Sequence, residues 1–209
     1  MNDRRAMSSP MTSTDCVRSL IDRTEANLKV IEQMGGDFVF PVLNEWRYAT
    51  RHLVSILPDG ELGEEDASKA INHMKRAYFD SCDILIDCQL YAISQVCERC
   101  RGYAEVVCKV IPEYSSWRES LRKAARLHRE AQAIHGDERI AACESLVPCI
   151  EELDGILDKL TFHADEIVAA VRRAKANFWL SVIAKAAGII VGAIAIVKFV
   201  CGVAAHLGS

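Results

Sequence analysis

Large apolar residues recur through residues 146–178 at spacings that alternate between four and three. They are Leu146, Ile150, Leu153, Leu157, Leu160, Ala164, Ile167, Val171, Ala174 and Phe178. This spacing is the heptad repeat of a helix that buries one stripe of its surface against a neighbour. In the same register the stripe continues through mostly small residues, which are Ser181, Lys185, Gly188, Gly192, Ala195, Phe199 and Gly202. We call all of these positions the seam.

The seam residues become small where the chain becomes apolar enough to enter a bilayer. Helices in water associate by burying apolar area, whereas helices in lipid need a close approach of their backbones. Gly188 and Gly192 form a GxxxG pair on the seam, which permits such an approach. The pattern therefore predicts one helix that self-associates along its length, and the alternative is that residues 146–178 pack on other helices of the same chain. The candidate residues of this oligomer and membrane seam are Leu153, Leu157, Leu160, Ile167, Val171, Phe178, Lys185, Gly188, Gly192 and Ala195.

Residues 178–205 are predicted to form a single transmembrane helix. From Phe178 to Val203 a helix would extend about 39 Å, against about 30 Å of hydrocarbon. Lys185 and Lys198 are separated by 12 uncharged residues, so each ammonium group can reach toward an interface. A helix lying on the membrane surface is the alternative, but the interval between the lysines offers no polar face.

Charges before this segment predict its orientation. Arg172, Arg173 and Lys175 precede it, and the residues that follow it are uncharged or weakly basic. The positive-inside rule then places the N-terminal part in the cytosol and the helix, as a single pass, in the inner (cytoplasmic) membrane. The first 15 residues are basic but contain no apolar run, so we expect no secretory signal.

The rest of the chain reads as helices separated by prolines and glycines, with no strand-like alternation. Gly102, or a point near Asp80, is expected to divide a long helical stretch, and Pro148 to kink the last helix. The expected helices span 14–34, 41–57, 64–111, 112–135 and from 136 onward. The predicted fold class is all-α: a helical bundle with a long C-terminal coiled-coil-like stalk that runs into one transmembrane helix. The predicted domains are a disordered lead-in at 1–12, a cytosolic bundle at 13–145, a heptad stalk helix at 146–177 and a transmembrane helix at 178–205.

Composition argues against several kinds of site. The net charge is −4, so nothing indicates a general nucleic-acid surface. The 9 cysteines are expected to be thiols in a reducing compartment. Cys97 and Cys100 form a CxxC inside a helical pattern without a second ligand pair, so we expect core packing and no metal. His128 and His135 are two turns apart with no carboxylate at ligand spacing, which favours a solvated or interfacial position. No cofactor is predicted.

Arg47 and His52 lie on the expected second helix, in the segment NEWRYATRHL of residues 44–53. This segment resembles the RxxxxH motif of HEPN-type helical domains, in which Arg and His of paired subunits converge on a phosphodiester; Tyr48 stands where a polar residue is usual. The resemblance implies a metal-independent ribonuclease with Arg47 and His52 as catalytic residues. Arginine can hold a phosphate, and histidine can act as acid or base near neutral pH. The alternative is a helix on which both residues make surface or inter-helix contacts.

A helical domain with one membrane helix also resembles membrane-associated effectors and accessory proteins of bacterial antiviral defence, including those that accompany RNA-targeting CRISPR nucleases. We therefore expect a non-enzymatic effector that oligomerises and perturbs or permeabilises the membrane. Lys185 on the seam would face the central axis, because a charge on an association face is costly unless it meets water. The expected partners are the lipid bilayer, further copies of the chain and a protein of the same defence system. The alternatives are a membrane-tethered HEPN-like ribonuclease, for which RNA is the partner, and a membrane scaffold.

Overall fold

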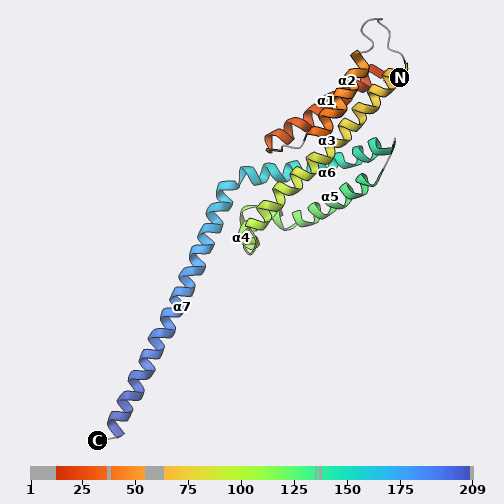
Figure 1. The fold of residues 1–209 in the computed structure, drawn as a ribbon. Helices are drawn as coiled ribbons and strands as arrows, with labels where there is room; N and C mark the ends of the chain where they lie inside the picture. The colour runs from red at the N-terminus through yellow and green to blue at the C-terminus, as the bar shows by residue number, and fades with distance from the viewer. Residues whose placement is uncertain (1–12, 37–38, 55–63, 135, 137, 208–209) are drawn as a thin grey trace, which may run out of the picture. The chain divides into compact units, whose positions relative to one another are not determined.

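The computed structural model describes residues 13–36, 39–54, 64–134, 136 and 138–207, with the backbone alone for 13, 14, 64 and 189–207. The described residues contain no strand, so the predicted all-α class is confirmed. The helices are α1 (Ser13–Gln33), α2 (Phe40–Val54), α3 (Glu64–Arg99), α4 (Ala104–Val110), the 3-10 helix η1 (Pro112–Ser115), α5 (Trp117–Gln132), α6 (Glu138–Phe162) and α7 (Ala164–Leu207) (Figure 1). The lead-in predicted at 1–12 lies outside the described residues.

The chain divides into two compact units. The first contains α1, α2, α3, α5 and the part of α6 up to Lys159; the second contains α4, η1 and α7. In the first unit, α1, α2 and α5 all contact α3. Its core is formed by the apolar faces of these helices. The fully or nearly fully buried members include Leu20, Leu28, Ile31, Val42, Met74, Tyr78, Cys82, Leu85 and Cys143.

The turn after α1 depends on two glycines. Gly35 has a φ of +73°, a left-handed conformation that side chains with a Cβ rarely adopt. Gly36 approaches its neighbours closely, because a Cβ there would lie 2.6 Å from Ile31 Cγ2 and 3.2 Å from Cys88 Sγ. The chain can therefore leave α1 tightly against α3.

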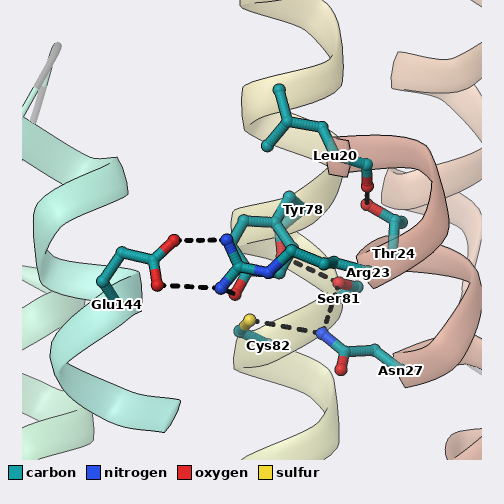
Figure 2. A network of polar contacts seen from close by, with 8 residues as sticks. All are labelled: Leu20, Arg23, Thr24, Asn27, Tyr78, Ser81, Cys82 and Glu144. Carbon is teal, nitrogen blue, oxygen red and sulfur yellow. Dashed lines mark hydrogen bonds and ion pairs between the residues drawn. The ribbon is translucent and has the colours of Figure 1, made fainter. Parts of the chain in front are cut away.

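Polar contacts also join α1, α3 and α6 in the first unit. Figure 2 shows the guanidinium of Arg23 between Tyr78 of α3 and Glu144 of α6. One Arg23 nitrogen donates to Glu144 Oε2 at 2.8 Å, and the guanidinium carbon lies 4.2 Å from the centroid of the Tyr78 ring. One turn further along α1, Asn27 donates to Ser81 Oγ at 2.9 Å. These bonds fix the register of three helices around the buried sulfur of Cys82.

In the second unit, α4 packs on α7. Gly102, with a φ of +84°, forms the turn between α3 and α4, which confirms the first of the two breaks considered for that stretch. Ile167 and Val171 are buried on the first part of α7, and Lys175 Nζ lies 5.5 Å from the centroid of the Tyr103 ring.

The helix predicted to run unbroken through the seam is instead two helices, since α6 ends at Phe162 and α7 begins at Ala164. His163 lies at the break, and its contacts stabilise the first turn of α7. Its Nδ1 lies 2.9 Å from Glu166 Oε2, and its carbonyl accepts a hydrogen bond from the Ile167 amide. Asp165 and Glu166 add negative charge to the first turn of α7, which the helix dipole favours. Residues 146–159 of the predicted stalk belong to the first unit.

Among the residues whose side chains the structure describes, no helix is both long enough and apolar enough to cross a membrane. Most of the predicted transmembrane segment at 178–205 lies outside that range, because side chains from 189 onward are not described. The helical backbone of α7 itself continues to Leu207.

Candidate functional site

The two residues of the predicted catalytic pair both lie on α2, but their contacts differ. Arg47 is exposed, and its guanidinium carbon is 5.2 Å from the centroid of the Tyr48 ring. His52 is half-buried, and its Nδ1 lies 3.1 Å from Asp66 Oδ1 on α3. Five residues along a helix turn by about 140°, so the two side chains leave α2 in different directions. Within one chain, the structure does not bring them together.

His52 is instead stacked on a second histidine. The rings of His52 and His73 have centroids 5.5 Å apart with planes 15° from parallel. His73 comes from α3, and its Nδ1 lies 2.7 Å from Glu45 Oε2 of α2. We call His52 and His73, with their carboxylates Asp66 and Glu45, the imidazole pair.

The arrangement of the imidazole pair determines which ring atoms can do chemistry. A carboxylate can only accept a hydrogen bond, so Nδ1 of each ring carries the proton. Nε2 is then the atom that can take a proton from a substrate or return one. The ring of Tyr48 stacks on His73 at 5.4 Å between centroids, which holds that ring in place. The sequence reading missed His73, although Asp66 and His73 are seven residues apart and therefore on one face of α3.

A second polar cluster surrounds His128 of α5. This side chain is buried, with 5% of the residue exposed. Its Nε2 lies 2.6 Å from Asp83 Oδ1 and its Nδ1 lies 3.4 Å from Asp87 Oδ1, both on α3. Gln132 donates to Asp83 Oδ1 at 2.9 Å. The solvated position considered for His128 is therefore wrong. The other position considered, an interfacial one, agrees with its place between α5 and the carboxylates of α3.

Electrostatics in this cluster favour a charged pair. The hydrogen bond with Asp83 raises the pKa of His128, against the opposing effect of burial. Burial would raise the pKa of Asp83, but the hydrogen bonds from His128 and Gln132 outweigh it and lower that pKa. Protonated His128 thus links α5 to α3 between two carboxylates.

The same three residues have ligand atoms that all lie within 4.8 Å of one another. One imidazole nitrogen and two carboxylate oxygens suit zinc or a similar divalent ion. In the structure, however, both ring nitrogens of His128 face carboxylates and Gln132 adds a further bond, so the polar atoms are satisfied by the protein itself. The geometry fits an ion-paired contact between α5 and α3 better than an open metal site.

The seam residues fall into two groups that differ in how far their side chains are exposed. Leu153, Leu160, Ile167 and Val171 are buried within the chain and Leu157 is half-buried, whereas Phe178 and Lys185 are exposed. A Cβ added at Gly188 would meet nothing within 4 Å, and Gly192 and Ala195 have side-chain positions outside the described residues. The large side chains of the upper seam are therefore wholly or partly covered by the chain itself, whereas the described seam positions from Phe178 onward are exposed.

The described cysteines are free thiols, as expected. In the CxxC, Cys100 is buried and Cys97 is half-buried.

The chain was compared with known protein families, curated proteins and solved structures. No protein family, curated protein or solved structure matches the chain.

Proposed function

We propose that the chain is a membrane-anchored, self-associating helical effector that permeabilises the membrane, in the context of antiviral defence. The observation that carries the proposal is the apolar surface at the middle of α7. Phe178, Trp179, Leu180 and Ile183 are each 60% to 64% exposed. Successive residues on a helix are about 100° apart, so these four side chains are spread around much of its circumference. A helix that is apolar on most sides suits a lipid environment better than a one-sided docking surface.

The residues around this surface support the same proposal. Trp179 lies four residues after Lys175, the last of the basic residues Arg172, Arg173 and Lys175. This is the order expected where a cytosolic helix enters a membrane interface. Lys185 is exposed and lies on the predicted seam. In an oligomer its ammonium group would need water, and a central aqueous path supplies it.

The test is membrane potential in bacteria that express the full chain, followed with a potential-sensitive dye. We expect depolarisation that disappears when the chain ends at Lys175 and that changes with Lys185→Leu, because the charge would line the path. Lys198→Leu is the matched control, since position 198 is off the seam. Unchanged potential in cells whose membranes contain the full chain would count against a pore that opens without a trigger.

A second candidate, a membrane-tethered ribonuclease, is favoured by the imidazole pair. Two histidines, each oriented by a carboxylate, can serve as general base and general acid on the two sides of a phosphodiester. Exposed Arg47, on the same helix as His52, could contact a phosphate of the RNA. The two functions need not use the same part of the chain.

For the ribonuclease, we expect His73→Ala and His52→Ala each to lower RNA cleavage by the purified full chain about 100-fold or more. His163→Ala, at the junction of α6 and α7, is the matched control and should cleave normally. Cleavage that survives both substitutions would assign the imidazole pair to structure. If the chain neither depolarises cells nor cleaves RNA, a scaffold that holds a partner at the membrane remains.

A further inference from the structure

A polar pocket lies between α3 and the start of α6, within the first compact unit, and none of its described lining residues belongs to the imidazole pair. Its volume is about 320 Å³, near the lower end of the range for small-molecule sites. Its described lining residues include three basic side chains and no acidic one. The lining consists of Asn72, Lys75 and Arg76 from α3 and Gly136, Arg139 and Ile140 at the start of α6. A concave surface with this charge favours an anion.

Arg139 is the best positioned of the three cations. Its guanidinium carbon lies 3.8 Å from the centroid of the Phe79 ring, which fixes the plane of the group. Its Nε is buried and has no hydrogen-bond partner among the described residues. Since this nitrogen is shielded from solvent, a ligand oxygen would have to accept from the other nitrogens of the guanidinium.

The backbone places these cations where a helix also favours negative charge. Gly136, with a φ of +74°, forms the turn that precedes α6, and its carbonyl accepts a hydrogen bond from the Arg139 amide. Arg139 and Ile140 belong to the first turn of α6, the end at which a helix dipole attracts anions. The cationic side chains and the helix dipole thus act in the same direction, and the charge of Glu138 in the same turn opposes them.

Asp80 also lowers the positive charge of this basic group. Asp80, half-buried on α3, has its pKa raised to about 6 by burial, and the charges of Arg139 and Arg76 oppose that rise. At neutral pH Asp80 is mainly ionised, so it offsets part of the positive charge that the pocket presents.

We propose that this pocket binds a small phosphomonoester. The two guanidinium groups can each offer paired N–H donors to phosphate oxygens, and Lys75 adds a mobile third cation. Asn72 and Ile140 provide a polar and an apolar wall for the rest of the ligand. The volume suits a molecule of the size of a nucleoside monophosphate or a sugar phosphate and is too small for several linked nucleotides. This inference is independent of the membrane function.

The experiment is calorimetric titration of the full chain in detergent with AMP, inorganic phosphate and adenosine. We expect AMP and phosphate to bind and adenosine not to bind. Arg139→Gln and Lys75→Gln should each weaken AMP binding about tenfold, the usual effect of losing a charge-assisted hydrogen bond. Asp80→Asn should strengthen it about threefold at pH 7.5, because a neighbouring negative charge is removed. A purely structural role for Asp80 would not produce that gain.

The matched control is Arg126→Gln, since Arg126 is an exposed cation on α5 whose Nε lies 3.9 Å from Glu130 Oε1, outside the described lining of the pocket. It should bind AMP like the unchanged chain. Arg139→Gln also removes the contact with Phe79, so Lys75→Gln carries the test if the first variant does not fold. The proposal is overturned if AMP and phosphate fail to bind at millimolar concentration, if adenosine binds as tightly as AMP, or if Lys75→Gln and Arg126→Gln behave alike.

Discussion

Replacing Leu153 by alanine is expected to lower the free energy of unfolding by about 3 kcal/mol. Leu153 is 1% exposed, on the part of α6 that belongs to the first compact unit. Removing its outer carbons loses their burial and leaves a cavity that the packed helices fill only in part. The measurement is urea denaturation of the full chain in mild detergent, followed by circular dichroism.

Leu157→Ala is the matched control for this loss. Leu157 occupies the next seam position on the same helix but is half-buried, so we expect a loss of about 1 kcal/mol. The comparison separates the two interpretations of the seam. If Leu153→Ala cost less than about 1 kcal/mol and instead dissociated an oligomer, the upper seam would serve contacts between chains and not within one.

Replacing His128 by alanine is expected to lower the free energy of unfolding by about 2 to 3 kcal/mol at pH 6. The change removes a buried imidazolium that is paired with Asp83 and leaves Gln132 as the remaining partner of that carboxylate. The figure is below that of a fully buried ion pair, because the side chains of Asp83 and Asp87 are 29% and 66% exposed and solvent screens them.

The loss should depend on pH in a defined direction. The pKa of His128 is raised in the folded chain, so its contribution is complete below the unfolded value of about 6.5 and is lost as pH rises through the folded pKa. The pKa of Asp83 is lowered, so its contribution is present above about 4 and is lost as pH falls through the folded pKa. The difference in stability between the unchanged chain and His128→Ala should therefore be largest between about pH 4 and 6.5.

This prediction is best measured as the difference between two denaturation series over pH 4 to 9. Other groups whose pKa values change on folding, such as Asp80, largely cancel in that difference. Asp87→Asn is the control and should have a small effect, since Asp87 is mainly exposed and lies 3.4 Å from the ring. A difference that stays constant across the whole pH range would show that His128 contributes packing alone.

Local sequence determined most of the helices, because their boundaries depend on backbone chemistry within a few residues. Gly102 allows the left-handed turn that ends the α3 region, and Pro41 and Pro112 mark the first turns of helical segments. The break at His163 could also have been read from the sequence, since His163 is followed by Asp165 and Glu166, a helix-start pattern that the heptad spacing obscured.

Tertiary structure alone decided which polar side chains lie next to one another. His52 meets His73, His128 meets Asp83, and Arg139 joins Lys75 and Arg76 across helices that are far apart in the sequence. Spacing along one helix gives no information about a ligand or a partner that comes from another helix. The sequence by itself determined that this chain is helical, which faces of its helices are apolar and where its charges fall. The packing of α1, α2, α5 and α6 on α3 decided which charges pair and which line a pocket, because that depends on how helices rotate and cross.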